Sequence, residues 1–245
     1  MTDRTVIALT GTDRVAFLQG LVTNDVEKAD GSIIYTALLT PQGKFISDFF
    51  VLGQKDRLLI DVANVTAAEL VKRLSMYRLR SDVQIVETDI TVIRCENAPG
   101  ALKDPRHPEA GYRHYSNGSD DQPPKMTDWD NIRVAHLIPE TGIELTPDTY
   151  ILEAGFERLN GVDFKKGCYV GQEIVARMKH KTTLKKGLAR VSVDGPAHSG
   201  EAITADGKPV GTLHTIAGQH GIAYLRFDRA TGDMQAGDAV IRRID

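Results

Sequence analysis

One cysteine lies in a short run of residues whose types could support thiol chemistry. Residues 164–178 read F-K-K-G-C-Y-V-G-Q-E-I-V-A-R-M, which places Cys168 close to Lys165 and Lys166. Apolar residues then recur at helical spacing, so we expect a helix that begins beside the cysteine. The unpaired N–H groups of a helix start and the nearby ammonium groups both favour a thiolate. The pattern therefore predicts that Cys168 is a nucleophile or a ligand for a soft metal.

A structural interpretation of the same run stays open. A small buried cysteine between two glycines that are needed for a turn would give the same pattern, because free cysteine is commonly buried. Glu173 and Arg177 lie four residues apart, a spacing at which two charged side chains pair across one turn of helix. In this interpretation the run builds a helix and its polar face.

The second candidate is a carboxylate inside an apolar strand. Asp48 lies within residues 45–52, a run otherwise rich in Phe, Ile and Leu that follows a turn at 41–43. A carboxyl group desolvated on one face of a strand is suited to proton transfer or to binding an N–H edge. Strand alternation equally allows Asp48 to point to solvent, and the pattern does not decide between the two.

Other charged residues carry weaker signals. The basic run at 179–186 could meet the anionic tail of a ligand or an RNA backbone, or it could be a solvated loop. It contains no interleaved aromatic residue, so stacking on single-stranded nucleic acid is not supported. The seven histidines show no metal-ligand spacing and no C-x-x-C pair occurs, so we predict no metal site.

Composition limits the classes of protein to which the chain can belong. Its 245 residues, of which 41% are hydrophobic, can bury a substantial core over two or three compact units. A net charge of −3 gives no overall attraction to nucleic acid, so direct binding is not expected. Two cysteines cannot form a disulfide framework, and no signal peptide or membrane span is evident. We therefore expect a cytoplasmic protein without a membrane partner.

Hydrophobic periodicity predicts the elements of the first part of the chain. Short strands are expected in six runs: 5–9, 32–39, 45–52, 58–62, 83–86 and 90–93. One helix follows Asp13, and a second is predicted at 66–76, where Thr66 and Glu69 have the spacing of a capping box. Hairpins interleaved with helices favour an α+β fold over a doubly wound parallel sheet.

The remainder of the chain divides into a loop-rich part and a strand-rich part. Residues 96–128 are rich in proline and glycine and predict a loop region with a domain junction. Helices are expected at 131–137 and 150–159. Beyond Gly187, period-two alternation with recurring turns predicts a small β-barrel. We therefore expect three domains: 1–95, 96–186 and 187–245.

Several of these runs together resemble one known family. K-G-C-Y-V-G-Q-E at 166–173, F-L-Q-G-L-V-T-N-D-V at 17–26 and Y-R-L-R-S-D-V at 77–83 are similar to motifs of the YgfZ and IBA57/CAF17 proteins. These are folate-binding relatives of the glycine-cleavage T-protein that support iron–sulfur enzymes. The resemblance covers most of the first third of the chain and the cysteine motif. It implies a ring of antiparallel sheets with helices around a central pocket, and a C-terminal barrel.

The resemblance also implies a set of site residues. Asp48 or its neighbour Ser47 would take the place of the acidic residue of the T-protein that contacts the reacting part of tetrahydrofolate. Cys168 would be a reactive thiolate or a transient ligand near the pocket mouth, with Lys166 as its electrostatic support. Arg133 would line the pocket. Three residues would build the helix of the motif and its polar network: Gln172, Glu173 and Arg177.

The chain departs from the T-protein at one informative position. That enzyme holds the pterin ring with a glutamate in an R-L-E-A-G run, and the spacing to the cysteine motif aligns this run with residues 133–136. Ala135 would then stand where the glutamate is expected. Residues 152–155 read L-E-A-G but have the wrong spacing. The hold on the pterin would be altered, which speaks against efficient aminomethyl transfer.

Three functions follow, and the first is favoured. The chain would be a tetrahydrofolate-binding accessory protein for iron–sulfur enzymes, with client enzymes or assembly proteins as partners. It could instead be a tetrahydrofolate-dependent aminomethyltransferase, which needs an intact pterin carboxylate and gives Cys168 no required part. The third possibility is a module that binds RNA or an RNA-modifying enzyme, for example in tRNA modification, with binding that weakens steeply with salt.

Overall fold

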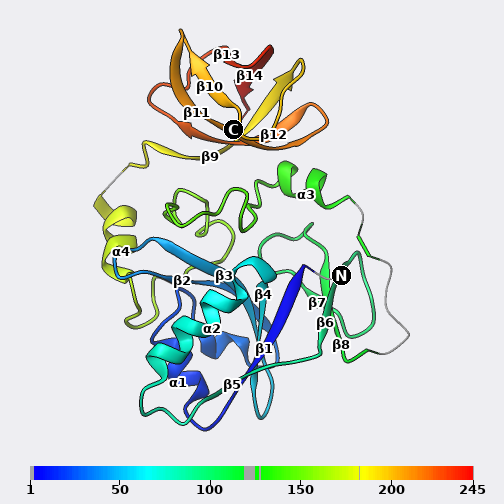
Figure 1. Cartoon of the computed structure of the whole chain (residues 1–245), viewed down its shortest axis with the longest axis vertical. Coiled ribbons are helices and arrows are strands. Elements are labelled where there is room, and N and C mark those ends of the chain that lie inside the picture. Colours follow the sequence, from blue (N-terminus) through cyan, green and yellow to red (C-terminus); the bar gives the residue numbers. More distant parts are fainter. Residues whose placement is uncertain (1–2, 119–124, 127, 182, 245) are drawn as a thin grey trace. The chain divides into compact units, whose positions relative to one another are not determined.

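The computed structural model describes residues 3–118, 125, 126, 128–181 and 183–244 (Figure 1). The chain divides into two compact units, each built from two separate stretches. Unit 1 comprises Met1–Thr127 and Phe156–Ala176, and unit 2 comprises Asp128–Gly155 and Arg177–Asp245. The sequence predicted a different division, into three contiguous domains, and that division stays a prediction.

Unit 1 is organised around a five-stranded antiparallel sheet with the order β2-β3-β4-β1-β5. Its strands are β1 (Arg4–Thr10), β2 (Ile33–Leu39), β3 (Phe45–Gly53), β4 (Leu58–Ala63) and β5 (Gln84–Glu87). The predicted strands and the hairpin around the turn at 41–43 are therefore confirmed. Every residue of β2 is buried, because other segments cover both faces of the sheet.

One face of the sheet packs against helices. The helical elements here are α1 (Arg14–Gln19), the 3-10 helix η1 (Val26–Ala29) and α2 (Asn64–Arg78). Leu70 and Leu74 of α2 share one hydrophobic cluster with Phe49 of β3. The predicted helix at 66–76 is confirmed but begins two residues earlier, after Ala63. Thr66 therefore does not cap it, and its hydroxyl group instead hydrogen-bonds to Ser47.

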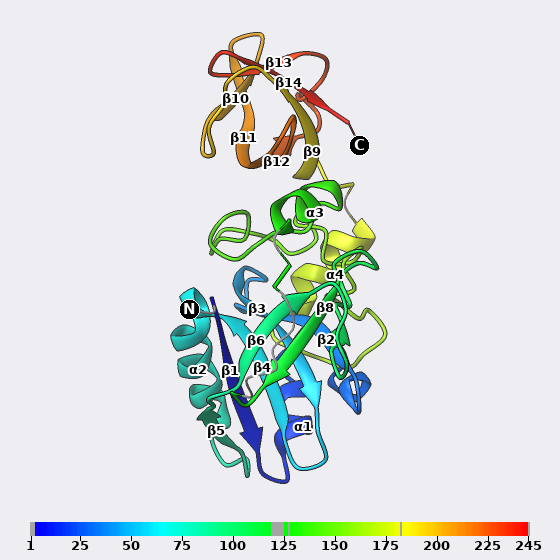
Figure 2. The same ribbon diagram turned by 90° about the vertical axis from the view of Figure 1, so that its right-hand side faces the viewer.

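The other face carries a small three-stranded sheet with the order β6-β8-β7 (Figure 2). Its strands are β6 (Thr91–Cys95), β7 (Leu102–Lys103) and β8 (Tyr112–Ser116). Val92 of β6 packs with Val6 and Leu59, which point away from the helices. Cys95 ends β6 and is 1% exposed, so this cysteine is a buried strand residue.

The predicted helix at 150–159 is wrong. Residues 151–160 form successive turns, because Gly155 has a φ angle of 79° and Asn160 one of 55°, and neither belongs to a right-handed helix. The apolar spacing reflects burial of turn residues such as Phe156. The helix expected at 131–137 is confirmed as α3 (Trp129–Ala135), and α4 (Gln172–Lys181) follows the cysteine.

Unit 2 contains a closed barrel with the strand order β10-β11-β12-β9-β14-β13. Its strands are β9 (Lys186–Asp194), β10 (Ala202–Ala205), β11 (Lys208–Ala217), β12 (His220–Arg226), β13 (Met234–Ala236) and β14 (Ala239–Arg243). Inward-facing residues such as Val191, Leu213 and Ile241 form its core. The predicted α+β fold with a C-terminal barrel is thus confirmed. None of the helices within the described ranges is long and apolar enough to cross a membrane.

Candidate functional site

Cys168 lies on an exposed, irregular segment that leads into α4. The helix begins at Gln172, four residues later, so the thiol precedes the first turn, where helix N–H groups and the helix dipole act. The helix therefore begins later in the chain than the sequence predicted. The alternative of a buried cysteine is wrong, and it is the exposure of Cys168 that makes its thiol reachable.

Lys166 anchors this segment from inside. The side chain is 9% exposed, and its ammonium group donates to three backbone carbonyl oxygens at 2.7, 2.5 and 3.0 Å: those of Gln19, Val22 and Asn24. Burial lowers the pKa of Lys166 to about 8, although the carboxylates of Asp25 and Asp163 act in the opposite direction. An ammonium group has three donors, so these carbonyls occupy all of them. Lys166 thus ties the cysteine segment to residues 19–24.

Two glycines allow the cysteine motif to pack closely against the turn between β2 and β3. Gly171 has a φ angle of 83°, and a Cβ atom there would lie 2.6 Å from the carbonyl oxygen of Thr40. Gly43, in the turn itself, has a φ angle of 74°, and a Cβ atom there would lie 2.8 Å from the Cβ of Ile174. Both positions therefore require glycine. The cysteine motif and the β2–β3 turn are therefore in direct contact.

The three polar residues of α4 that were expected to form a network differ in their contacts. The side-chain amide of Gln172 donates to the carbonyl oxygen of Gly167 at 3.4 Å, which joins the start of the helix to the cysteine segment. Glu173 and Arg177 are both exposed. The Gln172 hydrogen bond therefore supports the conformation around Cys168.

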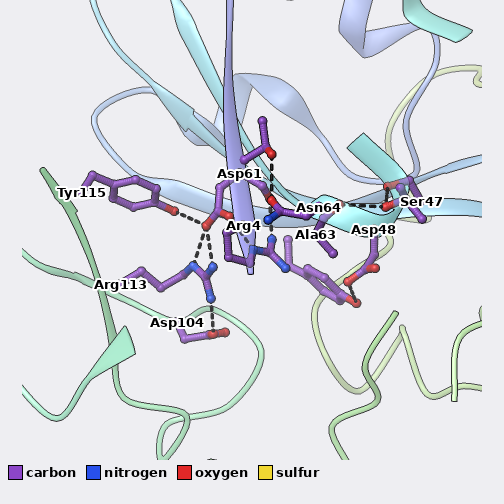
Figure 3. Close-up of polar contacts among 12 residues, drawn as sticks. Arg4, Ser47, Asp48, Asp61, Ala63, Asn64, Asp104, Arg113 and Tyr115 are labelled. Carbon is purple, nitrogen blue, oxygen red and sulfur yellow. Dashed lines mark hydrogen bonds and ion pairs between the residues drawn. The ribbon is translucent and has the colours of Figure 1, made fainter. Parts of the chain in front are cut away.

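Asp48 lies on the sheet face that is opposite to the helices (Figure 3). It is 3% exposed and accepts a hydrogen bond from the Tyr35 hydroxyl group at 2.9 Å, so the solvent-facing alternative is wrong. Ser47 points the other way and bonds to Thr66 at 2.9 Å. Burial and the Asp48 carboxylate raise the pKa of Tyr35 well above its ordinary value. The phenol therefore stays protonated and donates to Asp48.

Aromatic rings surround the Tyr35 side chain. The ring centroids of Phe50 and Phe156 lie 5.2 and 5.0 Å from that of Tyr35. The guanidinium of Arg106 lies 5.4 Å from the Tyr35 centroid and 4.9 Å from that of Phe50. A Cβ atom on Gly161 would come within 2.6 Å of the Phe156 ring, so glycine is needed for this packing. The result is a carboxylate and a phenol set among aromatic faces.

A buried ion-pair network lies on the same sheet face and was not predicted from the sequence. Asp61 of β4 accepts hydrogen bonds from Arg113 at 2.5 and 2.8 Å, from Arg4 at 2.6 Å and from Tyr115 at 2.9 Å (Figure 3). Burial alone would raise the pKa of Asp61, but the charges of Arg113 and Arg4 lower it to about 2. Asp61 is therefore ionised throughout the physiological range.

The network continues to Arg106 through a second carboxylate. Asp104 accepts from Arg106 at 3.0 and 2.7 Å, and its carboxylate lies 3.6 Å from Arg113. All three side chains are at most 4% exposed. The chain of pairs thus fixes Arg106, which in turn lies over the rings of Tyr35 and Phe50. It holds the surroundings of Asp48 in one arrangement.

A cavity of about 480 Å³ adjoins these residues within unit 1. Its lining includes Tyr35 and Asn24 on one side, and Phe164 and Lys165 from the cysteine segment on another. Lys28 also lines it and forms an ion pair with Asp163 at 2.5 Å. Tyr35 therefore both lines this cavity and donates to Asp48. The cavity combines apolar walls with two ammonium groups and the Asp163 carboxylate that pairs with Lys28.

Arg133 belongs to unit 2, where its guanidinium has four partners. It donates to Glu144 at 2.9 Å, to Asp130 at 2.8 Å, to the carbonyl oxygen of Ile138 at 3.5 Å and to the hydroxyl group of Thr215. Arg133 is 1% exposed, and these contacts join α3 to barrel strand β11. Its expected place in a ligand pocket stays a prediction. In the part of the chain that the structure describes, no group of three or more His, Cys, Asp or Glu residues could hold a metal ion.

Two family models match the chain at its two ends. The GCVT N-terminal domain matches residues 1–95, which include the five-stranded sheet. The C-terminal beta-barrel domain of CAF17 matches residues 185–244, which contain the closed barrel. Over its full length the fold is similar to the glycine cleavage system aminomethyltransferase T from Bartonella henselae, with a TM-score of 0.79. That match covers 99% of this chain and 83% of the other at 12% identity, and so shows the fold alone.

The curated relatives are named iron–sulfur cluster assembly factors. The chain is 30% identical over 222 residues to the mitochondrial IBA57 homolog of Mycosarcoma maydis, and 32% identical over 227 residues to that of Neurospora crassa. These matches cover 77% and 76% of this chain, and about half of each relative, 55% and 51%. Mitochondrial IBA57 of Mus musculus is 27% identical over 280 residues, which cover 94% of this chain and 78% of the relative.

These names contradict the expected cytoplasmic location. The relatives are named mitochondrial proteins. The expectation rested on two free cysteines and the missing disulfide framework. Free thiols persist wherever thiols are kept reduced, so they do not identify one compartment among the reducing ones.

Proposed function

Since the chain belongs to the IBA57/YgfZ family, which is related to the glycine-cleavage T-protein, we propose that it is an iron–sulfur cluster assembly factor that binds a reduced folate. The observation that carries the proposal is the exposed thiol of Cys168, which Lys166 and Gly171 hold in place within the same unit as Asp48. A thiolate is a natural ligand for iron and for sulfur-bridged clusters. The proposed partners are therefore proteins that carry or receive such a cluster.

Cys168 can supply one thiolate to a cluster in transit. Protein-bound clusters usually take several cysteine ligands, so the remaining ligands would come from the proteins that deliver or accept the cargo. The Lys166 anchor and the glycine fit limit the movement of the segment that carries the sulfur atom. The chain would thus present one fixed, reachable ligand to a partner.

The residues around Asp48 have the chemistry that a pterin requires. The Asp48 carboxylate is suited to accept hydrogen bonds from a ring N–H edge, and the Tyr35 phenol orients it. The buried rings of Phe50 and Phe156 pack on the Tyr35 ring and so fix the phenol that orients the carboxylate. Lys28 and Lys165 line the adjoining cavity, where ammonium groups would suit the glutamate carboxylates of a folate. When bound, a reduced folate would supply an acceptor for a one-carbon unit.

An aminomethyltransferase is a weaker proposal for this chain. The spacing argument puts Ala135 where the T-protein has its pterin glutamate, and Ala135 has no carboxylate. Its carbonyl oxygen accepts a hydrogen bond from Arg190. Folate binding through Asp48 does not depend on that position.

The deciding experiment compares Cys168→Ser with Cys95→Ala in cells that lack the chain. We expect Cys168→Ser to lose most of the rescue of an iron–sulfur enzyme such as aconitase and to keep its affinity for tetrahydrofolate, measured by calorimetry. Cys95 is buried, so Cys95→Ala should rescue normally. Asp48→Asn should weaken tetrahydrofolate binding at least about tenfold. Full rescue by Cys168→Ser would remove the thiol from the mechanism, and unchanged binding by Asp48→Asn would remove the folate assignment.

A further inference from the structure

The C-terminal end of α2 presents an apolar and basic surface that the proposed function does not use. Leu79 is 89% exposed and Met76 is 61% exposed. Arg78 and Arg80 flank Leu79 and are exposed as well. We call residues 76–80 the α2 apex. An isolated exposed leucine is ordinary in folded proteins, so the apex is of interest only because of its backbone and its surroundings.

The backbone of Leu79 has a conformation that leucine rarely adopts. Leu79 follows the last residue of α2 and has φ and ψ angles of 42° and −104°. Glycine usually occupies a helix end with positive φ, because it has no Cβ atom to clash with the carbonyl group. At Leu79 a strained backbone and an exposed apolar side chain occur together. Such strain persists when neighbouring structure enforces it, and it is common at binding sites.

Hydrogen bonds between two turns fix the chain shortly after Leu79. Asp82 accepts from the backbone N–H and the hydroxyl group of Thr12 at 3.0 and 2.8 Å, and its own N–H donates to the Asp13 carboxylate at 2.8 Å. Gly11 has a φ angle of 101°, and a Cβ atom there would lie 2.1 Å from the carbonyl oxygen of Asp82. The two turns are therefore fixed to each other, which limits the movement of the chain that follows Leu79 before any partner binds.

A groove lies directly beside the leucine. It has a volume of about 790 Å³ and is lined by Asp13, Tyr77, Leu79, Arg80 and Ser81. Its walls thus combine an aromatic ring, an apolar side chain and a guanidinium group. Aromatic and arginine side chains next to an apolar anchor are typical of the residues that dominate protein–protein affinity.

We propose that the α2 apex is a docking surface for a partner protein that offers an apolar patch bordered by carboxylates. Leu79 would insert into that patch, and Arg78 and Arg80 would pair with its acidic border. Asp13 also lines the groove, so the carboxylates of the partner would lie next to Arg78 and Arg80 and away from Asp13. A uniformly anionic membrane fits less well, because it would place negative charge against Asp13 as well. The inference rests on the proposed function only in that an assembly factor acts together with other proteins. It requires neither Cys168 nor a folate.

The first part of the test uses photocross-linking of the full chain in the cells in which it rescues. p-Benzoylphenylalanine replaces Leu79 in one variant and Val65 in the control. Val65 is 76% exposed near the start of the same helix, about 20 Å away by helix rise. We expect a discrete adduct from position 79 alone, with the cross-linked residue of the partner lying beside Asp or Glu. Equal adducts from both positions, or none, would overturn the proposal.

The second part measures the identified partner as a purified protein. Arg80→Glu should weaken binding at least tenfold, and exchange of the neighbouring partner carboxylate for lysine should restore it. Leu79→Gly relieves the strained backbone, so this variant should melt at a higher temperature and still lose at least tenfold in affinity. Rescue of aconitase separates this surface from the proposed function, because Cys168→Ser tests the thiol and Leu79→Gly tests the docking surface. Two results would assign the apex to another occupant and overturn the proposal. One is flotation of the protein with vesicles that contain 30% phosphatidylserine, and the other is oligomers of the chain itself in light scattering.

Discussion

The three carbonyl oxygens around the Lys166 ammonium lose their donor when that side chain is shortened or made neutral. Lys166→Met should lower the free energy of unfolding by about 2 kcal/mol, because buried acceptors without a partner are costly. Lys165→Met is the matched control, since Lys165 is exposed, and it should change stability by less than about 0.5 kcal/mol. Urea unfolding followed by circular dichroism measures both. Equal losses in the two variants would contradict the anchoring role.

The buried carboxylate of Asp61 makes stability depend on acid pH. Its pKa in the folded protein is about 2, lowered from 3.8, so its contribution is fully present above about pH 4 and is lost as the pH falls towards 2. That difference corresponds to about 2 kcal/mol. Asp61→Asn removes this dependence and takes the shared carboxylate away from buried Arg113 and half-buried Arg4, at a cost of about 3 to 5 kcal/mol near neutral pH.

Urea unfolding between pH 2.5 and 6 tests this dependence. The gap in stability between the unsubstituted protein and Asp61→Asn should narrow as the pH falls below about 4. Asp56→Asn, in the exposed turn between β3 and β4, should instead follow the unsubstituted curve at a constant offset. A constant gap for Asp61→Asn would show that Asp61 is not the group that titrates.

Single residues were predicted from the sequence to different extents. Asp48 was found because one carboxylate in an apolar strand is unusual, and Asp61 in L-L-I-D-V carries the same signal but was overlooked. The partners of Asp61 lie far from it in the sequence, since Arg113 is 52 positions away. Spacing rules cover neighbours on one element, so they do not reveal such a pair. The three carbonyl partners of Lys166 were out of reach for the same reason.

Among the elements, the contact between the motif and the β2–β3 turn depends on the absence of side chains. Gly171→Ala should cost at least about 2 kcal/mol, because the new Cβ atom would meet the carbonyl oxygen of Thr40 in a backbone with positive φ. Gly167→Ala is the control within the same motif, since a Cβ atom there would meet nothing within 4 Å. Thermal melts and the rate of Cys168 alkylation measure the two effects. Similar behaviour of both variants would show that the contact does not hold the segment.

Elements with a strict period were predicted well, and those with an irregular backbone were not. The strands of the large sheet, α2 and the barrel follow from alternation, helical spacing and regular turns. The apolar spacing at 150–159 imitated a helix, although Gly155 and Asn160 have positive φ angles and turn the chain instead. The displaced start of α4 has a similar cause, because the contact of Gly171 with Thr40 involves a segment distant in sequence.

For the whole molecule, the important fact is that each unit is assembled from two stretches of the chain. Within unit 2, Glu144 accepts from Arg133 at 2.9 Å and from Thr215 at 2.6 Å, which links residues 128–155 to the barrel. Glu144→Ala leaves the Arg133 charge buried and should destabilise unit 2 by about 3 kcal/mol. Trp129 is the single tryptophan and lies in unit 2, whereas Cys95 is buried in unit 1.

These two residues allow the units to be followed separately in urea. The Trp129 fluorescence transition of Glu144→Ala should move to lower urea by more than the transition for thiol reactivity of Cys95. Glu157→Ala, at an exposed position of unit 1, should move neither. Equal shifts of the two probes in Glu144→Ala would mean that the units unfold as one.

The return of the chain to unit 1 at Phe156 also sets an order of events during synthesis. The ammonium of Lys166 and the carbonyl of Asn24 that it binds are separated by 142 positions. On a ribosome the large sheet can be complete while those carbonyls still face water, because N-terminal parts generally fold first. The cysteine becomes a presented thiol only when translation has passed through the first stretch of unit 2, Asp128–Gly155, and returned to unit 1. A nascent chain that stalls before this point would have its large sheet but would lack the presented thiol of Cys168.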